Sequence, residues 1–152
     1  SRGSGGDFPS AAGAVARVAG WEDVGMNREI SPGSIAPPAA AYAHAVLTTA
    51  ATRWLHTSGV VPTRPDGTTP DDIGEQAAVV WANIAAMLDD AGMEPSDIVS
   101  VTTYVVVGEP LAEVMAARDG FLAGHRAAST LVTVPALAQP QWRMEVAVVA
   151  AT

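Results

Sequence analysis

The stretch IVSVTTYVVV, residues 98–107, decides the fold of this chain. Nearly every position in it is β-branched or apolar, and Gly108 and Pro110 follow it as chain breakers. Strands that are covered on both faces show such near-continuous apolar runs. We therefore expect residues 98–107 to form a central, well-buried strand, and the rest of the chain to cover the sheet that contains it.

A helix is predicted on either side of this strand. The helix before it begins at Asp71 or Asp72, whose carboxylate suits an N-cap, and ends at Gly92, a typical C-terminal cap. The second helix spans residues 111–122 and ends near Gly124. Apolar side chains recur with helical period along the first helix, at Ile73, Ala77, Val80, Trp81, Ile84 and Leu88.

Five shorter stretches have the composition of strands. They are residues 26–30, 41–50, 53–61, 129–134 and 142–150. Only a short turn separates residues 41–50 from residues 53–61, so we expect these two to pair as a hairpin. The chain is thus predicted to be an α+β protein with the order β-β-β-α-β-α-β-β. About six strands would form one mixed sheet, with both helices on one face.

The second face of this sheet also needs cover. Val105–Val107 and Val148–Ala151 are consecutive apolar residues, so side chains on both faces of their strands are apolar. Exposed apolar surface of this extent usually marks an interface. We expect a closed cyclic oligomer in which the sheet faces of several copies cover one another.

Composition narrows the class of function. The 152 residues suit one domain and carry a net charge of −8 with no cysteine. The eight positive residues are all arginines and are scattered, which argues against a nucleic-acid partner. Without lysine no Schiff base can form with a carbonyl substrate, and without cysteine there is no thiol chemistry. No apolar run is long enough to span a membrane, and a cytoplasmic location fits the composition.

The N-terminal residues 1–20 are rich in Ser, Gly and Ala, and we expect them to form a flexible segment. Their first six residues, SRGSGG, have the composition of a cloning remnant. The folded domain is expected to span residues 21–152. No glycine-rich phosphate loop is present, and the three histidines lack the spacing of a metal site, so we expect neither cofactor nor metal.

Several short motifs, in a fixed order, resemble the Rid (YjgF-like) family. Tyr42-Ala43-His44-Ala45-Val46 is similar to the family's Tyr-Ser-Gln-Ala-Val, and Ser58-Gly59 is similar to its Ser-Gly-Gln. Gln76, Asn83, Ala91-Gly92, Ile98-Val99 and a closing strand with Glu145 follow in the expected order. The resemblance covers roughly residues 27–151. It implies a chorismate-mutase-like fold and a homotrimer with small-molecule pockets at its subunit interfaces.

The resemblance also implies an activity. Many members hydrolyse reactive enamines and imines, using an arginine fork for the substrate carboxylate and a glutamate that positions or activates water. Glu145, in a strongly apolar strand, matches that glutamate, and the alternative for it is a structural ion pair. RNA cleavage has been attached to some relatives, but the net charge of −8 argues against it here.

The chain departs from the family pattern before its penultimate strand. Arg126-Ala127-Ala128-Ser129-Thr130-Leu131 stands where the family has Arg-Pro-Ala-Arg-(Ser/Thr)-small. This comparison places Ser129 at the position of the second arginine, and Leu131 where a small residue would leave a wider pocket. Arg143 lies two residues before Glu145, so it either replaces the missing arginine or pairs with Glu145. Arg126 is a weaker candidate for the same role.

The predicted hairpin would bring four side chains together. Tyr42 and His44 alternate on one strand, and His56 and Ser58 alternate on the other. Tyr42 would stack on a planar substrate, Ser58 would donate a hydrogen bond beside Gly59, and His44 would act as an acid or base or simply pack. For His56 packing in the sheet is favoured, and His125 is read as a helix C-terminal cation.

Two hypotheses follow for function. The first is a Rid-type hydrolase or tautomerase for enamines, imines or related carbonyl-derived compounds. Its activity on 2-aminoacrylate-type carboxylates would be weak, because the arginine fork is missing. The second is a trimer of the same fold that binds a ligand or regulates without catalysis.

Overall fold

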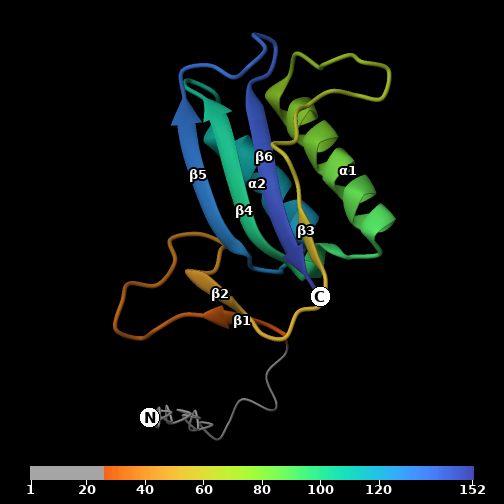
Figure 1. Ribbon diagram of the computed structural model, residues 1–152. Coiled ribbons are helices and arrows are strands. Elements are labelled where there is room, and N and C mark those ends of the chain that lie inside the picture. Colours follow the sequence, from red (N-terminus) through yellow and green to blue (C-terminus); the bar gives the residue numbers. More distant parts are fainter. Residues whose placement is uncertain (1–25) are drawn as a thin grey trace, which may run out of the picture.

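A four-stranded mixed sheet forms the centre of the molecule (Figure 1). The computed structural model describes residues 26–152, so the expectations for residues 1–20 lie outside the described part of the chain. The strand order is β3 (Trp54–His56), β6 (Met144–Ala151), β4 (Ile98–Val106) and β5 (Ala128–Val134). β4 runs parallel to β5 and antiparallel to β6, and this interior position confirms the prediction for residues 98–107.

Both helices contribute to one core against this sheet. α1 (Ile73–Ala91) begins after Asp72, whose side chain accepts a hydrogen bond from the Glu75 backbone, and ends at Gly92 in a left-handed conformation. α2 (Leu111–Leu122) lies behind the sheet in Figure 1, and η1 (Pro95–Asp97) is a short 3-10 turn before β4. Trp81 of α1 and Phe121 of α2 stack with ring centroids 4.7 Å apart. The second helix has the predicted bounds, and its C-cap is Ala123 in the left-handed region, one residue before Gly124.

The predicted hairpin between residues 41–50 and 53–61 is wrong. β2 (Ala45–Thr48) pairs antiparallel with β1 (Asn27–Ile30) in a separate two-stranded sheet, whereas β3 pairs with β6. The turn between β2 and β3 passes through Ala50 at φ 57°, and the backbone of Thr152 then binds that of Thr52 and Arg53. The element order is as predicted, but the six strands form sheets of four and two strands instead of one.

The strands of the large sheet have two different faces. Val101 and Val105 of β4 and Met144 and Val146 of β6 are buried against the helices. Residues between them point the other way, because side chains alternate along a strand. We call this opposite side the open face; it carries Ser100, Thr102, Tyr104, Ala128, Thr130, Val132, Glu145, Ala147 and Val149.

The loop before α1 is held by a local turn. The Asp66 carboxylate accepts hydrogen bonds from the hydroxyl and the backbone N–H of Thr68, at 2.7 and 2.9 Å, and these bonds lower the pKa of Asp66. No helix in residues 26–152 has both the length and the apolar character that crossing a membrane requires.

Candidate functional site

Glu145 is the candidate with the most specific surroundings. It lies on the open face of β6 and is partly exposed, between Met144 and Val146, which are both buried in the core. Its carboxylate rests directly on the backbone of Gly59: a Cβ atom at Gly59 would stand 1.6 Å from Oε1. Only glycine therefore allows Glu145 this position, and two residues that were predicted separately from the motifs lie in contact.

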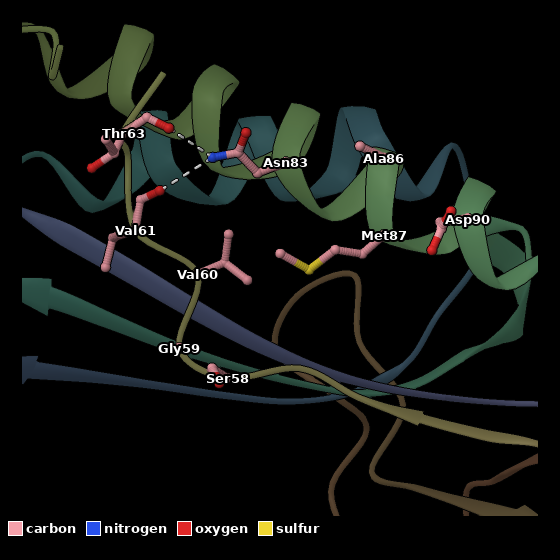
Figure 2. A pocket seen from close by; sticks show the side chains of 9 residues that line it. All are labelled: Ser58, Gly59, Val60, Val61, Thr63, Asn83, Ala86, Met87 and Asp90. Carbon is pink, nitrogen blue, oxygen red and sulfur yellow. Dashed lines mark hydrogen bonds between the residues drawn. The ribbon is translucent and has the colours of Figure 1, made fainter. Parts of the chain in front are cut away.

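The segment that contains Gly59 also forms one wall of a groove (Figure 2). The groove measures about 620 Å³ and runs between residues 58–63 and the exposed side of α1. Its lining is mainly apolar, and Asp90 is the charged residue in it. The Asn83 amide donates to the carbonyl oxygens of Val61 and Thr63 and so fixes the segment to the helix. The lining residues are Ser58, Gly59, Val60, Val61, Thr63, Asn83, Ala86, Met87 and Asp90.

Tyr104 is the nearest cross-strand neighbour of Glu145 on the open face. The two residues are direct partners in the β4–β6 register. The next rung of the sheet carries small side chains on all three strands: Ala147 pairs with Thr102, and Thr102 pairs with Thr130 of β5. The surface beside Glu145 therefore combines one aromatic ring with open space and hydroxyl groups.

Arg143 does not pair with Glu145. Its guanidinium forms an ion pair with Glu109 at 3.0 Å, and the Glu109 side chain is only 16% exposed. The Arg143 backbone N–H donates to the side-chain oxygen of Gln76. Within one chain, Arg143 therefore forms no ion pair with Glu145. A role for Arg143 in binding a ligand would require it to leave Glu109.

Ser129 and Leu131 lie on the helix side of β5, away from the open face. Ser129 is in register with the buried Val101, and its hydroxyl accepts a hydrogen bond from Arg118 of α2 at 3.1 Å. Leu131 packs against the hydrophobic core. Within one chain these two residues therefore face the helices and not the surface that carries Glu145. On the open face β5 presents Ala128, Thr130 and Val132 instead.

Tyr42 and His44 lie at the far edge of the sheet from Glu145. Ala43 between them forms a bridge to Ala128 of β5, whereas Ser58 and Gly59 adjoin β6 at the opposite edge. The two rings contact each other edge to face at 6.0 Å, and His44 bonds the Ala36 carbonyl. The predicted convergence of Tyr42, His44, His56 and Ser58 thus does not occur within one chain, because it depended on the hairpin.

The remaining candidates have structural partners. Arg126 forms an ion pair with Glu29 at 3.1 Å and donates to the Tyr42 carbonyl, and His125 bonds the Ile98 carbonyl. His56 stacks on the exposed Trp54 instead of packing into a core. Within residues 26–152 no cluster of three or more His, Asp or Glu side chains is placed to hold a metal ion.

Tyr104, Met87 and Asp90 were not predicted as site residues. Tyr104 lies on the open face of β4. Side chains alternate between the two faces along residues 98–107, and this alternation could have identified Tyr104 once Glu145 was taken as a site residue. Met87 and Asp90 are exposed residues of α1 that belong to none of the family motifs, so no sequence signal assigned them to a groove.

Comparison with known proteins shows the family of this chain. The family model described as Endoribonuclease L-PSP matches residues 33–152. The crystal structure of a Rid-family protein of unknown function from Yersinia pestis is 32% identical, with a TM-score of 0.77. The alignment covers 84% of this chain and 99% of that one. The chain belongs to the Rid (YjgF-like) family.

Two further relatives support the Rid assignment. A YjgF-family protein from Neisseria meningitidis is 27% identical with a TM-score of 0.59, over 72% of this chain and 86% of its own. A curated relative, the 2-iminobutanoate/2-iminopropanoate deaminase of Escherichia coli (strain K12), is 35% identical over 72 residues. That match covers 47% of this chain and 56% of the relative, so the chain spans about half the length of the curated relatives it matches.

Proposed function

We propose that this Rid-family chain hydrolyses enamines or imines, with the Glu145 carboxylate as the catalytic acid and base. The observation that carries the proposal is the contact of the Glu145 carboxylate with the backbone of Gly59. This contact positions a partly exposed carboxylate in an otherwise apolar strand. The similarity to an imine deaminase supports the same class of reaction.

The chemistry needs one group that exchanges a proton with water. Glu145 would accept a proton as water attacks the imine carbon, and would return it to the nitrogen as the carbon–nitrogen bond breaks. Tyr104, directly across from Glu145, would offer a ring against which a planar C=N group can lie. We propose that no cofactor takes part, since water is the only other reactant.

A homotrimer would complete this site. Glu145 and Gly59 adjoin one edge of the sheet, whereas Tyr42 and His44 lie at the other edge. A cyclic assembly joins different surfaces of neighbouring copies, so the Tyr42 edge of one copy can meet the Glu145 edge of the next. The small-molecule pocket would then lie between subunits, and the open face would be covered. The cytoplasm is the proposed location.

The test is hydrolysis of an imine by Glu145 variants. Glu145→Gln keeps the shape of the side chain but cannot accept a proton, so we expect its rate to fall about 100-fold or more, close to that of Glu145→Ala. The rate of carbonyl product formation from an imine generated in situ measures this. Turnover that survives in both variants would remove Glu145 from the mechanism.

The alternative is a ligand-binding trimer without catalysis. The groove along α1 has the size of a small-molecule site and would serve this role equally. In that case the wild-type protein would bind compounds in the groove, while imines would decay at the same rate with and without it.

A further inference from the structure

The arginines that border the candidate site are engaged by other groups. Arg143 is paired with Glu109, and Arg126, at the Tyr42 edge, is paired with Glu29. Arg118 lies beneath β5, bonded to Ser129 and Asp119 on the helix side of the sheet. Within residues 26–152 no ion pair joins an arginine to Glu145. A substrate anion would therefore find no free guanidinium on the open face of this chain.

The charges that remain near the site are negative. Glu145 stands on the open face, and Asp90 lies in the groove that shares Gly59 with it. The other groups nearby are neutral: the Tyr104 ring, the Thr102 and Thr130 hydroxyls and the apolar lining of the groove. A carboxylate brought into these surroundings loses hydration, gains no cationic partner and is repelled by Glu145.

We infer that the substrates of this site are imines or enamines without a carboxylate, uncharged or protonated on nitrogen, with an apolar substituent. The inference rests on the proposed function and names its substrate class. A protonated imine is attracted by Glu145 and is the more reactive form toward water. The apolar substituent matches the ring of Tyr104, the direct cross-strand partner of Glu145.

The reaction of such a substrate balances without any further reactant. The oxygen of one water molecule bonds to the imine carbon, and the carbon–nitrogen bond then breaks. Two protons of that water end on the nitrogen, one of them passed through Glu145. The products are ammonia and an aldehyde or ketone, and nothing is oxidised or reduced.

The first experiment compares two imines generated in situ with the purified full chain. Benzylimine, made from benzylamine by a flavin amine oxidase, carries no carboxylate, whereas 2-iminopropanoate, made from alanine by an amino-acid oxidase, does. We expect the protein to accelerate benzylimine hydrolysis at least about tenfold more than that of 2-iminopropanoate. An equal or larger acceleration of 2-iminopropanoate overturns the inference but leaves imine hydrolysis standing. If neither imine is hydrolysed faster than in buffer, the proposed function itself fails.

The second experiment adds the missing charge. Thr130 is exposed on the open face, about two strand spacings, or ~10 Å, from β6, and only Thr102 and Ala147 share its rung. Thr130→Arg should raise kcat/KM for 2-iminopropanoate about tenfold, because a guanidinium fork then reaches the substrate carboxylate, which also pairs the new charge on the open face. Thr130→Gln has a long polar side chain without charge and should not produce this gain. A comparable gain in Thr130→Gln, or none in Thr130→Arg, would count against charge as the reason for the preference.

Discussion

At the scale of single residues, Gly59 determines where the Glu145 carboxylate can lie. In Gly59→Ala the new methyl group would occupy the place of the Glu145 carboxylate, so the flexible end of that side chain has to move. We expect the imine-hydrolysis rate to fall at least about tenfold, while the free energy of unfolding changes by only about 1 kcal/mol. Gly33→Ala is the matched control, since a Cβ atom there meets nothing within 4 Å. A fully active Gly59→Ala protein would contradict the assigned role of this contact.

Ser129 has a structural role under the sheet. Arg118 is only 6% exposed, and its guanidinium donates to the Ser129 hydroxyl. Ser129→Ala should therefore lower the free energy of unfolding by about 1–3 kcal/mol, because a buried charged donor loses its acceptor. Thr130→Ala, at the exposed neighbouring position, should change it by less than about 0.5 kcal/mol.

The same pair of variants separates the two interpretations of Ser129. Chemical denaturation measures stability, and turnover per folded molecule measures function. Ser129→Ala could instead be as stable as the wild type but bind or turn over substrate poorly. That result would show that Ser129 contacts the ligand, and it would contradict a purely structural role on the helix side.

At the scale of elements, local signals were sufficient for most of the fold. The helix α1 was predicted with Asp71 or Asp72 as its N-cap and Gly92 as its C-cap, and β4 to within one residue, because periodicity and capping are read from neighbouring residues. The pairing of residues 41–50 with 53–61 failed because strand partners are chosen by long-range contacts, here with β1 and β6.

The faces of β5 could not be predicted for a related reason. A shift of one residue in register moves every side chain to the other face of a sheet. The motif comparison placed Ser129 and Leu131 toward a ligand, whereas their parallel pairing with Val101 and Thr103 turns them toward the helices. Glu145 and Gly59 were both named from short motifs, and the structure places them in contact, with Gly59 in the segment that pairs with β6.

Gln76 connects α1 to two loops of the fold. It is completely buried, its amide donates to the carbonyls of Pro70 and Gln141, and its oxygen accepts from the Arg143 backbone. Gln76→Met, of similar size, should lower the free energy of unfolding by about 3 kcal/mol or more, since buried backbone groups lose their partners. Asn83→Met should cost less, because Asn83 is only partly buried. Equal losses in the two variants, measured by urea denaturation, would contradict this ranking.

At the scale of the whole molecule, the proposed homotrimer predicts that other copies cover the open face. Val149 lies on this face and is partly exposed in the single chain, whereas Ala82 is exposed on the outside of α1. Sedimentation equilibrium of the wild-type protein should give three times the mass of the chain. Val149→Lys should shift the mass toward one chain, because a charge cannot be buried there unpaired, and Ala82→Lys should not. A wild-type protein of single-chain mass would rule out the shared site.

The role of Gly59 in positioning the catalytic Glu145 is tested most directly by a double-mutant cycle on these two residues, measured as kcat/KM for imine hydrolysis. If Gly59 acts by holding the Glu145 carboxylate, Gly59→Ala should have almost no effect once Glu145→Ala is present. The double variant would then be as active as Glu145→Ala alone. The double variant could instead be slower by the product of the two single effects. That result would show that the two residues act independently, and it would contradict the proposal that Gly59 positions Glu145.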